Sequence, residues 1–196
     1  MRLLCAVAIS LLLAGCIQGP VYQREDLPSV VLRPSERLPG TVLRQRGPEP
    51  LEDLALYFGD LEEAGFVAAY GTALGHEDVL SGDVEPGSLP ASEARGVQST
   101  AILFAEAGGA DIVLDSQREA VGKGPFEVQA WLPADGLGEE GFGARARSRH
   151  GLTATLFQWR RGNLLLFLNV LGEFTVAQVR ALAGGMERRA EETLVA

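Results

Sequence analysis

The chain has 196 residues, with 26 acidic side chains against 17 basic ones and a formal net charge of −9 at pH 7. A protein with this negative charge is repelled by phosphate backbones and by anionic lipid headgroups. The charge therefore argues against a nucleic-acid partner and against a polybasic membrane anchor. The length corresponds to one ordinary domain, large enough to bury a core without disulfides.

The chain begins with a secretory segment that ends at a cysteine. Arg2 supplies a positive start, and residues 3–14 form an apolar stretch of about twelve, short of the roughly 20 that a membrane-spanning helix needs. Leu13-Ala14-Gly15-Cys16 resembles the lipobox of bacterial lipoproteins, in which the cysteine is diacylated and the chain is cut just before it. The resemblance implies a signal peptide over residues 1–15 and an extracytoplasmic protein of the cell envelope. Acyl chains on Cys16 would hold it on a membrane.

The cysteine content agrees with an extracytoplasmic location. Cys5 would leave with the signal peptide and Cys16 would carry lipid, so the mature chain would hold no free thiol. Such a chain suits an oxidising compartment. The alternative is an uncut apolar N-terminus with Cys16 as a free thiol. Which membrane holds the anchor stays open.

The next segment is rich in proline. Residues 16–39 contain Pro20, Pro28, Pro34 and Pro39. Proline at this density forbids a long helix or a central strand, because the ring fixes φ and removes the N–H donor. We therefore predict that the lipidated cysteine is followed by an extended tether over residues 16–39.

Residues 40–196 have the patterning of a single folded domain. Three-four spacing of apolar residues predicts helices at 51–61, at 107–121 and from Thr175 onward, where Thr175 and Gln178 have the spacing of a capping box. A loop rich in Gly, Pro and Ser is expected at 75–96. Strands are expected at 41–46, 66–70, 97–104, 126–132, 142–149, 152–160 and 163–171. We expect an α+β domain, a mostly antiparallel sheet of about six or seven strands with about three helices.

The last two strands flank Arg161-Gly162, which predicts a tight hairpin. The second of them, residues 163–171, is apolar on both faces except at Asn163 and Asn169, so it should be central and covered on both sides. Asn169, deep in this apolar run, is a candidate polar anchor for a ligand. Its alternative is a buried amide satisfied by backbone groups.

A glycine motif and two charged clusters have weaker functional interpretations. Residues 136–141 match G-x-G-x-x-G, but two glutamates stand where a pyrophosphate would lie and a strand follows, so we expect an inter-strand loop. Arg145, Arg147 and Arg149, beside His150, could bind a carboxylate or phosphate or could form a solvated face. Five potential ligands in one loop fit a surface loop better than a metal site, and we expect no metal and no cofactor: His76, Glu77, Asp78, Asp83 and Glu85.

The aromatic side chains of the predicted strands raise the same question of core or cleft. Trp159 is a candidate ligand-binding residue if these rings line an apolar cleft with a few polar anchors, and a core residue otherwise. Catalysis finds little support. The sequence lacks a G-x-S-x-G elbow and an H-E-x-x-H motif, and only His76 and His150 could serve as imidazole bases. We expect that the protein is not an enzyme.

A second resemblance rests on the order of two motifs. Gly136-Leu137-Gly138-Glu139-Glu140 followed by residues 157–163 (FQWRRGN) looks like a loop and hairpin of uncharacterised envelope lipoproteins, some of which are similar to the PsbP-like α/β sandwich. That resemblance implies an antiparallel sheet with helices on its faces and a role in binding or assembly. We expect a non-enzymatic lipoprotein that binds a partner protein or a small ligand. The alternative is a carrier of a lipid or another apolar molecule between sheet and helices.

Overall fold

A computed structural model describes residues 21–76, 95–124 and 126–195. The helices are α1 (Leu27–Val30), α2 (Leu51–Phe58), α4 (Ala107–Lys123) and α5 (Val176–Val195), with two short 3₁₀ turns near the N-terminus. The strands are β1 (Thr41–Pro48), β2 (Phe66–His76), β3 (Gly96–Phe104), β4 (Phe126–Leu132), β5 (Glu140–Ser148), β6 (Thr153–Arg161) and β7 (Leu164–Leu171). The predicted α+β class is confirmed.

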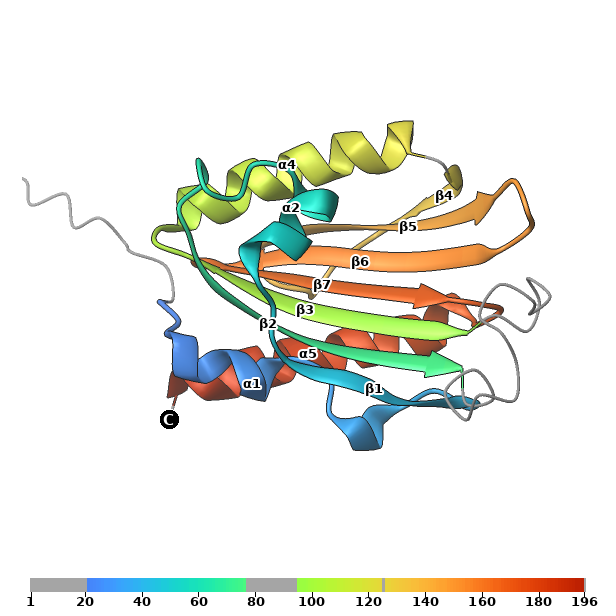
Figure 1. The fold of residues 1–196 in the computed structure, drawn as a ribbon, viewed down its shortest axis with the longest axis horizontal. Helices are drawn as coiled ribbons and strands as arrows, with labels where there is room; N and C mark the ends of the chain where they lie inside the picture. Colours follow the sequence, from blue (N-terminus) through green and yellow to red (C-terminus); the bar gives the residue numbers. More distant parts are fainter. Residues whose placement is uncertain (1–20, 77–94, 125, 196) are drawn as a thin grey trace, which may run out of the picture.

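All seven strands form one antiparallel sheet in the order β1-β2-β3-β7-β6-β5-β4. β7 lies at its centre, paired with β3 on one side and with β6 on the other, as its two-faced apolar sequence predicted (Figure 1). The hairpin between β6 and β7 turns at Gly162, whose φ of 56° is a backbone conformation that glycine adopts without strain.

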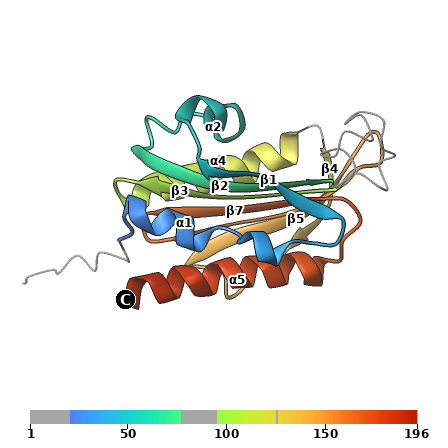
Figure 2. The same cartoon turned by 60° about the horizontal axis from the view of Figure 1, so that its bottom comes forward.

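Helices cover both faces of the sheet. Figure 2 shows α5 and α1 beneath it and α2 with α4 above it. One core cluster packs the α5 side, where Val179, Ala183 and Met186 are fully buried. A second cluster packs the side of α2 and α4, around Phe58 and Leu165. The result is three layers, so each strand of the sheet centre must be apolar on both faces.

The ends of the two long helices follow from local sequence. At the start of α5 the backbone N–H of Thr175 donates to Oε1 of Gln178 at 2.9 Å, and the N–H of Gln178 donates to Oγ1 of Thr175 at 3.2 Å. This reciprocal pair is the capping box that the sequence predicted. Near the start of α4, Gly109 lets the helix approach the turn before β2, because a Cβ there would lie 2.0 Å from the carbonyl oxygen of Ala64.

The prediction of an extended tether over residues 16–39 is wrong for its described part, residues 21–39. These residues form α1 and the 3₁₀ turns and pack against α5 and the sheet. Six of their apolar side chains are buried, because the prolines start short turns instead of keeping the chain extended: Tyr22, Leu27, Val30, Val31, Leu32 and Leu38. The folded domain therefore begins about twenty residues earlier than the sequence pattern indicated.

The G-x-G-x-x-G segment is the inter-strand loop that was expected. It leads into β5, and no helix starts within it. Gly138 has a φ of 59°, and a Cβ there would lie 2.1 Å from the carbonyl oxygen of Arg160. The carboxylate of Glu139 accepts hydrogen bonds from the Arg160 guanidinium and from the Gly162 N–H. The motif thus fastens this loop to the β6–β7 hairpin.

Candidate functional site

An apolar cleft of about 230 Å³ opens between α4 and the sheet. The helix side of the cleft consists of Gln117, Ala120 and Val121 of α4. The sheet contributes side chains from the centre and the far strands: Phe126, Ala146, Ala154, Leu156, Asn169 and Leu171. The cleft therefore lies beside β7, on the face that α2 and α4 cover.

Asn169 is the polar group in the floor of this cleft. Its Oδ1 is buried and has no hydrogen-bond partner among the described residues. Across the strands it faces Gln98 of β3 and Leu156 of β6. A buried amide oxygen without a partner costs about 1–3 kcal/mol, a cost that a donor from a bound molecule would remove. The structure thus places the predicted anchor residue in an apolar cleft.

Two further buried amide side chains, those of Gln117 and Gln158, lie on this face of the sheet and contact each other. Gln117 donates from Nε2 to the carbonyl oxygen of Tyr57 at 2.9 Å, which ties α4 to the end of α2. Gln158 donates to Oε1 of Gln117 at 3.5 Å, and its own Oε1 is buried without a described partner. Sequence reasoning missed both glutamines, although a polar residue at each of these buried positions is a signal of the same kind as Asn169.

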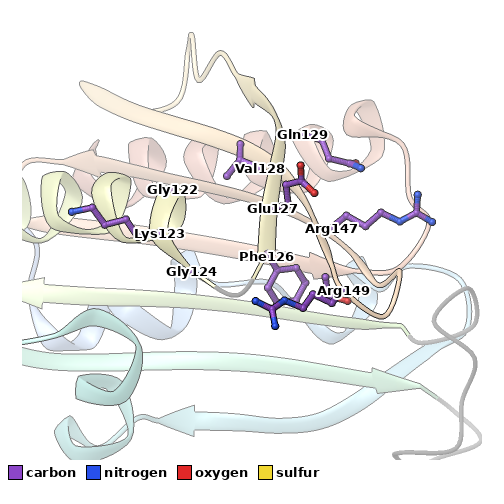
Figure 3. Close-up of a pocket in the computed structure, with 10 residues that line it drawn as sticks. Gly122, Lys123, Gly124, Phe126, Glu127, Val128, Gln129, Arg147 and Arg149 are labelled. Carbon is purple, nitrogen blue, oxygen red and sulfur yellow. The ribbon is translucent and has the colours of Figure 1, made fainter.

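A polar hollow of about 550 Å³ adjoins the cleft at the end of α4. Figure 3 shows the side chains that line it, which come from the end of α4, from β4 and from the end of β5: Lys123, Phe126, Glu127, Val128, Gln129, Arg147 and Arg149. Three of these side chains are cationic and one is a carboxylate. We call this the cationic hollow.

The partners of the three cations differ. Lys123 is paired with Glu119 one turn earlier on α4, and Arg147 donates from Nε to the carbonyl oxygen of Gly151 at 3.3 Å. Glu127 lies directly across from Arg147 in the register of β4 and β5. Arg149 is exposed and makes no hydrogen bond or ion pair with the described part of the chain.

Gly124 and Phe126 line both the cleft and the hollow. An apolar compartment and a cationic compartment therefore share a wall, at the end of the sheet where β7 finishes. The two together have the composition of a small-molecule site, which is mostly apolar with a few polar groups that fix orientation.

The other predicted site residues lie elsewhere. Arg145 points to the α5 face, where its guanidinium is 3.6 Å from the carboxylate of Glu173. Trp159 is fully buried on that same face and donates from Nε1 to Glu187 at 2.7 Å. Neither reaches the cleft, so Trp159 fits the core interpretation. Of the five possible metal ligands at residues 76–85, His76 ends β2 and the other four lie outside the described residues. The described residues hold no group of metal-binding side chains.

A buried polar network closes the opposite end of the sheet. Its members are Tyr22, Trp159, Arg161, Asn163 and Glu187. Asn163 accepts from the Tyr22 N–H at 2.8 Å and donates from Nδ2 to the carbonyl oxygens of Tyr22 and Phe104. Glu187 accepts from both Trp159 and Arg161. Burial raises the pKa of the Tyr22 hydroxyl, which donates to the carbonyl oxygen of Ala190.

Comparison with known proteins identifies a shared fold. No protein-family model matches the chain, and no curated protein sequence matches it. A similar solved structure is the extracellular domain of PknH from Mycobacterium tuberculosis, with a TM-score of 0.62 and 12% identity over 89% of this chain and 99% of that one. The two chains share a fold. At this identity the likeness shows nothing beyond it.

The comparisons leave the two sequence resemblances as predictions. Neither the lipobox nor the PsbP-like sandwich is supported by a family match. Within the described residues, no helix is long and apolar enough to cross a membrane.

Proposed function

We propose that the chain is a non-enzymatic, lipid-anchored binding protein of the cell envelope, which holds a small molecule in the cleft beside Asn169. The observation that carries the proposal is the unpartnered amide oxygen of Asn169 in a mostly apolar cleft. The similar fold of an extracellular domain of PknH supports an extracytoplasmic setting.

The proposed anchor would lie very close to the domain. Only the short stretch between Cys16 and Val21 separates the lipidation site from the described fold, a span of at most about 18 Å in fully extended chain. Tyr22 is already fastened to Asn163 at the start of β7. The domain would therefore stand directly on the bilayer surface instead of reaching away from it on a tether.

The cleft lies at the other end of the same strand. Asn163 precedes β7 and Leu171 ends it, so the two residues are about 25 Å apart at the rise of an antiparallel strand. Figure 1 shows α1 and the end of α5 at one end of the sheet and the β5–β6 hairpin at the other. This placement favours binding of a ligand or partner at the end of the domain that is farther from the proposed lipid anchor.

Substitution of Cys16 tests the anchor. We expect that Cys16→Ser, expressed in the native host, abolishes labelling by radioactive palmitate and shifts the protein out of its normal membrane fraction. Cys5→Ser is the matched control, because that residue precedes the predicted cut and should leave labelling intact. Palmitate labelling that survives in Cys16→Ser would overturn the lipoprotein assignment.

Native mass spectrometry tests the binding function. Residues 17–196, purified without detergent, contain the whole described sheet and both helical layers. We expect a retained small molecule in the wild-type chain and its loss in Ala120→Trp, whose indole would fill the cleft from an exposed position of α4. Retained phospholipid would favour the alternative, a lipid carrier. A bare mass together with capture of a protein partner that is insensitive to Ala120→Trp would contradict the ligand site.

A further inference from the structure

The geometry points to one class of ligand: an amphipathic anion whose mostly apolar chain, with one hydrogen-bond donor for Asn169, lies in the cleft and whose carboxylate or comparable head lies in the cationic hollow. This inference rests on the proposed binding function and names the substrate class of the same site. Its basis is the shared wall, because Gly124 and Phe126 belong to both compartments.

The hollow supplies the charge that an anionic head needs. Lys123, Arg147 and Arg149 line the hollow together with the carboxylate of Glu127, and Lys123 is also paired with Glu119. The chain as a whole carries −9, so this local surplus of positive charge stands out against the rest of the molecule. Charges farther away than about 10 Å are screened at physiological ionic strength, so a bound anion responds mainly to the local cations.

Arg149 is the group best placed to receive that head. It is exposed at the end of β5, and no described residue occupies its guanidinium. Figure 3 shows it at the same end of β4 as Phe126, the ring that separates the hollow from the cleft. A planar guanidinium binds a carboxylate through two parallel N–H donors.

The cleft supplies the apolar compartment. Its walls are aliphatic and aromatic side chains, with Val121 from the helix and Leu156 and Leu171 from the sheet. A volume of about 230 Å³ suits a chain of moderate length and excludes a second folded element. Burial of each further methylene should tighten binding about fourfold until the cleft is full.

Titration with matched soluble probes tests this inference. Residues 17–196 would be titrated with hexanoate, octanoate and 1-octanol, with affinities measured by calorimetry or amide NMR shifts. We expect octanoate to bind more tightly than hexanoate by about sixteenfold, because it carries two more methylenes. We expect Arg147→Gln/Arg149→Gln to weaken octanoate at least fivefold at low salt without changing 1-octanol. Arg44→Gln, on the distant strand β1, is the control and should change neither.

The outcomes separate this inference from the proposed function. Equal affinity for octanoate and 1-octanol, unaffected by the arginine substitutions, would overturn the anionic head while the cleft remains a binding site. Binding of the carboxylates that persists in Ala120→Trp would overturn the placement of the chain. Failure of all three probes to bind, beside a small molecule retained in native mass spectrometry, would refute the ligand class alone.

Vesicles distinguish the two sources of such an anion. We expect the unanchored chain to ignore vesicles of phosphatidylglycerol at concentrations where free octanoate binds, because lipid tails packed in a bilayer cannot enter the cleft. Sedimentation with these vesicles that is abolished by Arg147→Gln/Arg149→Gln and unaffected by Ala120→Trp would contradict the inference, since it would show a headgroup contact without an occupied cleft.

Discussion

Two asparagines near opposite ends of strand β7 have opposite hydrogen-bonding environments. Asn163, just before the strand, uses its amide for three hydrogen bonds to backbone groups of Tyr22 and Phe104. Asn169, six residues later, has a buried Oδ1 without a described partner and faces a cleft. An asparagine side chain thus bonds to the backbone near one end of the strand, whereas near the other end an asparagine keeps an amide oxygen available for a ligand.

This contrast separates a structural end from a binding end. Around Asn163 the polar groups form hydrogen bonds with one another, and these bonds hold the N-terminal segment to α5 and the sheet. Around Asn169 the amides of Gln158 and Asn169 each keep a buried oxygen unpaired. Buried polar groups in folded proteins are nearly all hydrogen-bonded, so the unpartnered oxygen of Asn169 in the wall of a cleft indicates a place for another molecule.

The largest expected effect comes from substitution of the two asparagines. Asn163→Leu should lower the free energy of unfolding by about 3–4 kcal/mol, because it leaves backbone groups of Tyr22 and Phe104 buried without partners. Asn169→Leu should change it by less than about 0.5 kcal/mol, or raise it, since no hydrogen bond is lost. Urea denaturation of both variants measures the difference. Equal losses at the two positions would erase the contrast.

A second test concerns the carboxylates that face Arg161. Glu187 is almost fully buried and accepts from Trp159 and Arg161, whereas Glu191 pairs with the same guanidinium while it is 55% exposed. We expect Glu187→Gln to cost about 2 kcal/mol of stability, because charge-assisted bonds are lost inside the core. Glu191→Gln should cost at most about 0.5 kcal/mol. Thermal unfolding distinguishes them, and a larger loss at Glu191 would contradict the role of the network.

Much of the fold could be predicted because its signals are local. Alternation located the strands, and the two-faced apolar run of residues 164–171 identified the central one. The capping box at Thr175 marked the start of α5. The segment at residues 21–39 was misjudged because proline density indicates a lack of regular structure, whereas burial of Tyr22 and Leu27 depends on α5, which is distant in sequence.

The site could be predicted only in part, for a similar reason. Asn169 stood out because it interrupts an apolar run, and Arg147 and Arg149 because they repeat along a strand. Which face each side chain takes, and which helix covers it, depends on the packing of three layers. Arg145 and Arg147 share one face of β5, yet Arg145 lies beside Glu173 whereas Arg147 donates to the carbonyl oxygen of Gly151. The polar residue at position 117 did not by itself show that α4 covers the cleft.

The smallest expected effect is a pH dependence of stability that comes from a buried carboxyl, that of Glu49. Glu49 precedes α2 on the cleft face of the sheet, and its Oε2 is buried without a described partner. Burial raises the pKa of its carboxyl, and the negative charge of Asp53 adds to that shift. The folded state therefore holds the proton more tightly than the unfolded state, and this group's contribution to stability falls as pH rises through the folded pKa.

Comparison of the wild-type chain with Glu49→Gln isolates that contribution. The two proteins should have similar melting temperatures near pH 4, where the carboxyl is protonated in both states. The glutamine variant should be the more stable one at pH 7, by a few degrees at most. Gly71→Ala is a second test of the same point. Its Cβ would overlap the present position of the Glu49 carboxylate and move that group toward water. The pH dependence of the melting temperature that Glu49 causes should then also disappear. A difference between wild type and Glu49→Gln that stays constant from pH 4 to 7 would mean that the carboxylate is already solvated in the fold, and the cleft face would then hold fewer unsatisfied groups than its geometry indicates.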